Sequence, residues 1–331
     1  MKRFIRTVIV LMIVGSLGAA ALPVSAKTIV SKEALSFVYE NEDYGNYKIP
    51  YRLFVPADYD AGKKYPVLLF LHGAGERGND NSSQFANAIQ TLFTAREKLL
   101  KETIVIIPQC PAGEQWVNTS WSNGNYSTDK VKESKSLSTV IKILEKVEEE
   151  YSCDTDRVYA FGLSMGGYGT WDLLARHGEL FAAAVPICGG GDESKAEALS
   201  DIPIWTCHSD KDPIVKFEGT ERMYQAISAY GKGKITFTPV ASSDHGAAWN
   251  AASSNKELID WLYSQKLSDR IETEPEPEPE PDNTADNTDV KPTEDKKSGL
   301  STGASVAIAA SAAAVTAGIA AAVMIKKKKK E

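Results

Sequence analysis

Short apolar runs recur along the central part of the chain and alternate with longer amphipathic segments. The runs have the length of strands and contain few polar positions; they cover residues 52–56, 65–73, 102–110, 156–164, 181–190, 202–210 and 234–241. Continuous apolar runs, unlike alternating ones, are typical of strands covered on both faces of a sheet. The pattern therefore predicts a mostly parallel sheet whose strands are buried.

Helical periodicity separates most of these runs. It is found near Gln84–Lys101, Val131–Tyr151, Met165–His177, Gly219–Ala229 and Asn255–Gln265. Strands that alternate with helices indicate βαβ units, and so an α/β domain with helices on both faces of its sheet. The turn-like residues 41–46, NEDYGN, join the first two strands without a helix, which predicts an antiparallel N-terminal edge.

The two ends of the chain differ in pattern from this core, which we place at residues 27–271. Residues 1–26 combine three basic residues, an apolar run and a small-residue site at Val24–Ala26, which predicts a signal peptide. An uncleaved N-terminal anchor is the alternative, because the apolar run approaches the length of a membrane span.

Residues 303–325 carry no charge and are followed by five lysines in the tail 326–331. This predicts a transmembrane helix with a cytoplasmic basic tail. Such tails resemble those of wall-sorted proteins, but the Leu-Pro of their sorting signal is missing; a transient sorting tail remains the alternative. Residues 272–302 alternate Pro and Glu, which predicts a disordered, extended linker. We therefore expect the core at the extracellular face of the cell membrane, with the cell wall as the alternative.

Composition narrows the range of functions. The chain has a formal net charge of −7, and its core has no basic cluster, so no nucleic-acid partner is expected. The core has the length of one large α/β domain. Its four cysteines, Cys110, Cys153, Cys188 and Cys207, show no C-x-x-C spacing. Export permits disulfides, but three of the four lie in or beside apolar runs, which favours unpaired thiols.

One glycine-rich turn carries candidate chemistry. Gly162-Leu163-Ser164-Met165-Gly166 has the pattern G-x-S-x-G, and it lies between a predicted strand and a predicted helix. This is the context of a nucleophile elbow, in which a strained turn exposes a serine hydroxyl at a helix N-terminus. Ser164 is therefore the candidate nucleophile, and the backbone N–H of Met165 is one candidate donor of an oxyanion hole.

A serine hydroxyl needs a base, and the chain has four histidines. We expect structural roles for His72, at a strand end, and His177, late in a helix. In the order Ser…Asp…His, an acidic residue must precede the base, which favours His245 over His208. Asp210 and Asp212 both lie between Ser164 and His245, so the residues alone leave two candidates for the acid.

A resemblance to a known family narrows the choice of the acid. The stretch HSDKDPIV from His208 looks like the α/β-hydrolase pattern H-G-x-x-D-x-x-V, whose aspartate is the triad acid, which places that role on Asp212; Ser209 replaces the usual glycine. Together with HGAGERGNDN, IIPQCP and GLSMGGYGTWDLLARH, it resembles secreted esterases once grouped as predicted peptidases, related to polyhydroxybutyrate depolymerases and feruloyl or acetylxylan esterases. The resemblance implies an α/β-hydrolase fold without a large lid, metal or cofactor, and Ala74 as the second oxyanion donor.

The candidate substrate contacts are Trp116 and Trp121, in the polar loop 112–129, together with Trp249 and Arg77. Indole rings stack on sugar or phenolic faces, although tryptophans also pack in cores. We therefore expect a monomeric esterase that removes feruloyl or acetyl groups from polysaccharide or oligosaccharide. A serine peptidase is one alternative because the acyl-enzyme chemistry is shared, and a surface binding protein on a hydrolase scaffold is another.

Overall fold

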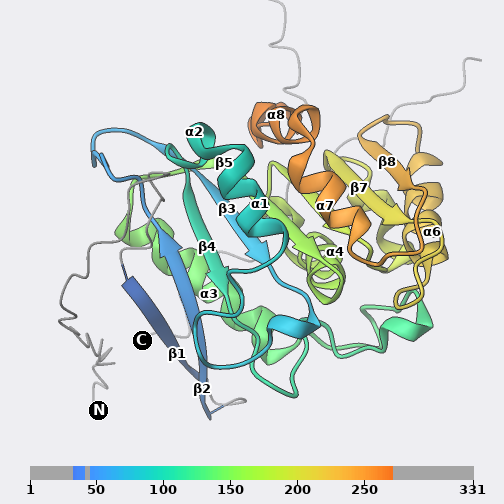
Figure 1. The fold of residues 1–331 in the computed structure, drawn as a ribbon, viewed down its shortest axis with the longest axis horizontal. Helices are drawn as coiled ribbons and strands as arrows, with labels where there is room; N and C mark the ends of the chain where they lie inside the picture. The colour runs from blue at the N-terminus through green and yellow to red at the C-terminus, as the bar shows by residue number, and fades with distance from the viewer. Residues whose placement is uncertain (1–32, 42–44, 271–331) are drawn as a thin grey trace, which may run out of the picture. The chain divides into compact units, whose positions relative to one another are not determined.

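The computed structural model describes residues 33–41 and 45–270 (Figure 1). The predicted signal peptide 1–26, linker 272–302, transmembrane helix 303–325 and basic tail 326–331 lie outside the described residues, so these assignments stay predictions. Within the described part of the chain, no helix is both long enough and apolar enough to cross a membrane.

Eight strands form one sheet in the order β1-β2-β4-β3-β5-β6-β7-β8. Strand β2 pairs antiparallel with β1 and with β4, whereas all other neighbours are parallel. The bounds are β1 Glu33–Asn41, β2 Gly45–Phe54, β3 Tyr65–Leu71, β4 Ile104–Pro108, β5 Cys153–Leu163, β6 Ala183–Ile187, β7 Ile204–Ser209 and β8 Ile235–Val240. The predicted mostly parallel sheet with an antiparallel N-terminal edge is confirmed.

The helices follow the predicted pattern with three differences. They are α1 Ala88–Ala95, α2 Glu97–Leu100, α3 Lys135–Glu150, α4 Met165–His177, α5 Ala196–Leu199, α6 Phe217–Ser228, α7 Ala247–Ser254 and α8 Lys256–Ser264. The single helix expected over 84–101 is broken at Arg96, which has non-helical dihedrals and donates its backbone N–H to Leu92. Helices α5 and α7 were not predicted: α5 has only four residues, and the alanines and serines of α7 show no clear apolar periodicity.

Strands β3, β4 and β6 are buried along their whole length, and the helices divide between the two faces of the sheet (Figure 1). In β3, Val67, Leu69 and Leu71 pack with α3, α4 and α6, while Leu68 and Phe70 pack with α1, α7 and α8. Successive side chains of a strand point to opposite faces, so a continuous apolar run supplies both cores at once. This explains why the apolar runs of the sequence mark the strands so clearly.

Helix α4 lies unusually close to the sheet because glycines face it. A Cβ atom on Gly166 would lie 2.0 Å from the carbonyl oxygen of Leu71 in β3, and one on Gly162 would lie 2.2 Å from the carbonyl oxygen of Gly166. Neither distance is possible for a real side chain, so only glycine allows this approach. The position of Ser164, between these glycines, therefore depends on them.

His72 fixes the loop that follows β3. Its side chain is buried, its Nε2 accepts a hydrogen bond from the Cys110 N–H at 2.9 Å, and its Nδ1 donates to the Gly73 carbonyl at 2.6 Å. Burial lowers its pKa to about 4, since the charged imidazolium loses its hydration. His72 is thus a neutral imidazole with a hydrogen bond at each ring nitrogen, which agrees with the structural role expected for it.

We predict that Gly166→Ala destabilises the fold by at least about 1–3 kcal/mol, the usual cost of overpacking a core. The added methyl group must push α4 away from β3. Gly75→Ala is the matched control, since a Cβ there would meet no atom within 4 Å. Urea unfolding of both variants measures the difference; equal stability of the two would contradict the close approach of α4.

We also predict that the free energy of unfolding falls as the pH drops from 6.5 toward 4. Below about 6.5 the unfolded chain protonates His72 while the folded chain does not, so acid favours unfolding, by up to about 3 kcal/mol at pH 4. His72→Gln removes this titration and retains an acceptor for the Cys110 N–H. Urea unfolding at pH 7 and pH 4.5 should show a smaller drop for the variant than for the native chain.

Candidate active site

Ser164 occupies a strained turn between β5 and α4. It is the N-cap residue of α4, with φ +54° and ψ −117°, a region of the Ramachandran map that non-glycine residues rarely adopt. Its backbone N–H donates to the Ile187 carbonyl at 2.9 Å, which ties the turn to the end of β6. The turn lifts the hydroxyl out of the sheet at the N-terminus of a helix, where the dipole favours negative charge.

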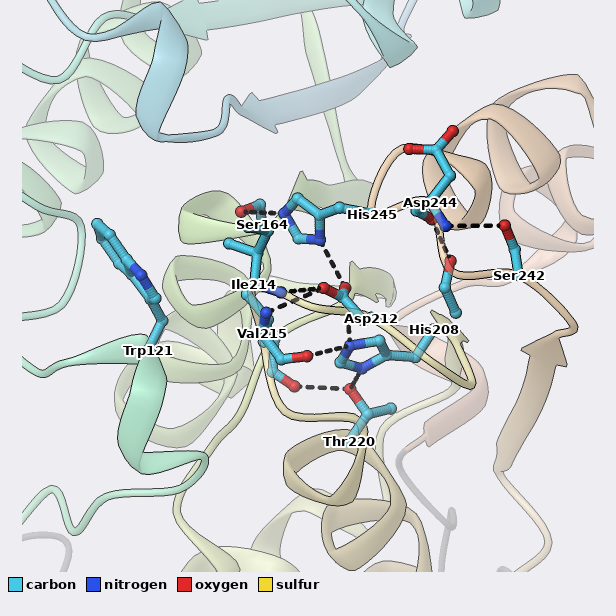
Figure 2. A network of polar contacts seen from close by, with 12 residues as sticks. Trp121, Ser164, His208, Asp212, Ile214, Val215, Thr220, Ser242, Asp244 and His245 are labelled. Atoms are coloured by element: carbon cyan, nitrogen blue, oxygen red, sulfur yellow. Dashed lines mark hydrogen bonds and ion pairs between the residues drawn. The ribbon is translucent and has the colours of Figure 1, made fainter.

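A chain of hydrogen bonds runs from this hydroxyl into the protein (Figure 2). The Nε2 atom of His245 lies 2.9 Å from Ser164 Oγ, and its Nδ1 lies 2.5 Å from Oδ2 of Asp212. Because the carboxylate accepts, Nδ1 carries the proton and Nε2 is free to accept from the serine. Asp210, the other candidate acid, is exposed and instead accepts from the backbone N–H of Ser242.

The Asp212 side chain is completely buried and receives hydrogen bonds at both oxygens. Oδ1 accepts from the backbone N–H groups of Ile214 and Val215, at 2.8 and 3.0 Å. Burial by itself would raise the pKa of Asp212, but hydrogen bonds from His208, His245 and these two N–H groups outweigh it and hold the pKa well below its usual range. The group therefore stays a carboxylate, able to hold His245 in one tautomer.

The two candidate oxyanion donors are the first residues of their helices. Ala74 begins the short 3-10 helix η1 Ala74–Glu76 and Met165 begins α4, so neither N–H has an intrahelical acceptor. The η1 loop passes beside the serine, since a Cβ on Gly73 would lie 3.6 Å from the Cβ of Ser164. Arg77, a predicted substrate contact, donates to the carbonyls of Ala74 and Glu114, at 2.8 and 3.2 Å, and so braces this loop.

The substrate prediction is wrong for Trp116. Its side chain is fully buried in the core beside α4, and its Nε1 donates to the His72 carbonyl at 3.0 Å, so it is not available to a substrate. Trp121, in contrast, is partly exposed, and Figure 2 shows it across from Ser164 and Ile214. Tyr168 of α4 donates to the Trp121 and Gly124 carbonyls, at 3.0 and 2.7 Å, which holds the Trp121 loop against the helix of the serine.

The other tryptophan contacts the base itself. The ring of Trp249, on α7, meets the His245 imidazole edge-on, with centroids 4.8 Å apart. Two residues whose roles the sequence did not indicate also support this site. Ser209 donates to the carbonyl of Asp244, next to His245, at 2.8 Å, and His208 contacts Asp212 from the side opposite His245. No spacing rule identifies such contacts, because they depend on how loops meet at the sheet edge.

Cys188 lies close enough for its Sγ, Asp212 and His245 to offer a metal three ligand atoms within 4.8 Å of one another. Two of these ligands already bind each other, and burial raises the pKa of the Cys188 thiol well above its usual value. A metal would therefore have to displace a strong hydrogen bond and deprotonate a buried thiol. All four cysteines are buried and unpaired, as expected.

A serine hydroxyl, an imidazole and a buried carboxylate in this geometry, next to two N–H groups at helix starts, can support acyl transfer. Comparisons with known proteins agree with that chemistry. The sequence profile of a family described as "Putative esterase" matches residues 44–265. A solved structure titled "Crystal Structure of a Thermostable Esterase" is 38% identical, with a TM-score of 0.62, over 71% of this chain and 64% of that chain.

Two curated relatives are more distant. "Probable feruloyl esterase C" of Aspergillus niger is 27% identical over 51% of this chain and 57% of its own length. A "Bifunctional acetylxylan esterase/xylanase" of Neocallimastix patriciarum is 26% identical over 47% of this chain and 20% of its own length. The chain thus spans only part of each relative. Its fold is that of the α/β-hydrolases, as predicted, and the profile match over most of the described residues shows that the chain belongs to this esterase family.

Proposed function

We propose that the protein is a serine carboxylesterase that hydrolyses acyl esters through Ser164, His245 and Asp212. The observation that carries the proposal is the unbroken chain of hydrogen bonds from the Ser164 hydroxyl to the buried Asp212 carboxylate. Membership of the esterase family supports it. In this arrangement the serine attacks, the histidine moves the proton, and the aspartate fixes the histidine.

In the first step, Ser164 Oγ attacks the carbonyl carbon of the ester while His245 Nε2 takes the hydroxyl proton. The negative charge that forms on the carbonyl oxygen is stabilised by the N–H groups of Ala74 and Met165. The protonated His245 then gives its proton to the alcohol oxygen as the carbon–oxygen bond of the ester breaks. The alcohol leaves, and the acyl group remains on Ser164.

In the second step, water takes the place of the alcohol. His245 removes a proton from the water, whose oxygen attacks the acyl carbon, and the tetrahedral intermediate again places its charge at the same two N–H groups. Collapse of this intermediate releases the carboxylic acid and returns the proton to Ser164. The Asp212 carboxylate stabilises the imidazolium in both steps and stays ionised throughout.

The proposed substrates are feruloyl or acetyl esters on plant polysaccharide. The names of the two curated relatives support this class. So do the side chains around the serine: Trp121 is a partly exposed aromatic ring, and Ile214, next to Asp212, is 54% exposed although it is a large apolar residue. Apolar side chains beside a nucleophile favour a phenolic or short acyl group over a charged one. The sequence patterns of residues 1–26 and 303–325 support the further proposal that the enzyme is exported and held at the membrane.

The first prediction concerns the nucleophile. Ser164→Ala should lower kcat/KM on para-nitrophenyl acetate by about three or more decades and abolish labelling by a fluorophosphonate probe. Ser122→Ala, in the exposed loop near Trp121, is the control and should label like the native chain. Retained hydrolysis by the Ser164 variant would contradict the proposal, and efficient cleavage of peptides with no release of ferulate or acetate would favour the peptidase alternative.

The second prediction concerns the acyl group. Trp121→Ala should raise KM for feruloylated oligosaccharides by about tenfold, the effect of losing one aromatic contact, and should change KM for acetylated ones much less. Tyr230→Ala removes another large exposed side chain, at the end of α6, and should change neither value. An equal effect of Trp121→Ala on both substrates would show that Trp121 supports the loop and does not select the acyl group.

A further inference from the structure

A second imidazole contacts the buried carboxylate. His208, the penultimate residue of β7, is fully buried, and its Nε2 lies 3.2 Å from Oδ2 of Asp212 (Figure 2). This is the same oxygen that accepts from Nδ1 of His245 at 2.5 Å. Asp212 is therefore held between two histidines, and only one of them reaches Ser164.

The partners of His208 determine where its protons are. Nε2 faces two acceptors, the Asp212 carboxylate and the Val215 carbonyl, each at 3.2 Å, so this nitrogen must carry a proton. Nδ1 lies 2.8 Å from the Thr220 hydroxyl, whose oxygen is also 2.7 Å from the Gly189 carbonyl, so the one hydroxyl proton is shared between these two acceptors. The ring is thus anchored on one side by Thr220 and directs an N–H at Asp212 on the other.

We propose that His208 is a positioning residue for the reaction: its Nε2–H holds Asp212 in the orientation that Nδ1 of His245 requires, and shares the negative charge of that carboxylate. This rests on the proposed esterase function of Ser164, His245 and Asp212. The backbone N–H groups of Ile214 and Val215 bind only Oδ1. Among the described residues, Oδ2 therefore receives hydrogen bonds from His245 and His208, and His208 is the one that does not take part in proton transfer.

The position of His208 suits this role. Its ring packs edge-on against Phe217 of α6, with centroids 5.6 Å apart, and α6 also supplies Thr220. Besides Asp212, the titratable groups near the contact are His245, Cys188 and Tyr168. When the N–H of His208 takes part of the charge of Asp212, less of that charge remains for the contact with His245.

Two amide substitutions separate this role from simple packing. In His208→Gln the amide N–H reaches the former place of Nε2 and can still donate to Asp212, whereas in His208→Asn it reaches only the place of Nδ1, beside Thr220. Both variants are polar and uncharged. The measurement is kcat and KM on para-nitrophenyl acetate from pH 5 to 9, with thermal unfolding midpoints for both variants and Ser164→Ala assayed alongside.

For His208→Asn we expect kcat to fall about 10- to 100-fold, as when the partner behind a metal-bound histidine is lost, with KM little changed. The acidic limb of kcat/KM should move up by about half a pH unit, because the carboxylate left with more charge holds a proton on His245 more strongly. His208→Gln should recover most of kcat and return the limb to its native position. A structural role would instead lower the unfolding midpoints of both variants and leave the limb unmoved.

Each failure has its own signature. If Ser164→Ala keeps its activity, the proposed function is wrong; if it is inactive while His208→Asn has native kcat and limb, the inference about His208 alone is wrong. Should either variant not fold, nitrogen NMR of the native chain decides the matter. The chain has four histidines, so single substitutions of His72, His177 and His245 identify the His208 signals by elimination. A protonated Nε2 at pH 7 is expected, and an unprotonated one would overturn the proposal.

Discussion

The arrangement at the carboxyl edge of the sheet depends on keeping one carboxylate charged without water. Asp212 has a completely buried side chain, and an ionised group in that position is tolerable only with several hydrogen-bond donors. Its donors come from the turn that follows β7, from β7 itself and from the loop before α7. Because all three segments donate hydrogen bonds to this one carboxylate, they lie close together, and His245 reaches Ser164 as a result.

The frame behind this site is set by how closely backbones approach one another. Gly162 and Gly166 let α4 lie against β5 and β3, which fixes where the turn at Ser164 emerges. His72 then ties the loop after β3 to the segment that follows β4, through the N–H of Cys110. The loop of Ala74 and the turn of Ser164 are consequently both positioned against β3. Strained backbone at Ser164 can persist because all of its surroundings are packed and hydrogen-bonded.

Much of this structure could be predicted from the sequence. The parts that could not be predicted share one cause. The strands were predictable because apolar runs buried on both faces leave a clear pattern, and the bounds of α4 agree because Ser164 and the glycines mark its start. Trp116 and Trp121 stand in the same polar loop, yet one is core and the other partly exposed, since the path of a loop is decided by distant partners such as Tyr168 and His72. The contact between His208 and Asp212 could not be predicted for a similar reason. It arises from the turn between the two residues, and the periodicity of apolar positions does not indicate it.

The loop that carries Trp121 has one further consequence. Tyr168 donates to two carbonyls of this loop, and Tyr126 of the loop donates to the buried Asp172 of α4 at 2.6 Å, so three hydrogen bonds join the loop to the helix that follows Ser164. A segment held in this way cannot swing over the serine independently of the helix. The loop of Trp121 is therefore a fixed wall of the site and does not close over the serine by itself. A fixed wall of this kind would suit the proposed substrate, an ester on a long polymer, because such a polymer has to be bound from the side.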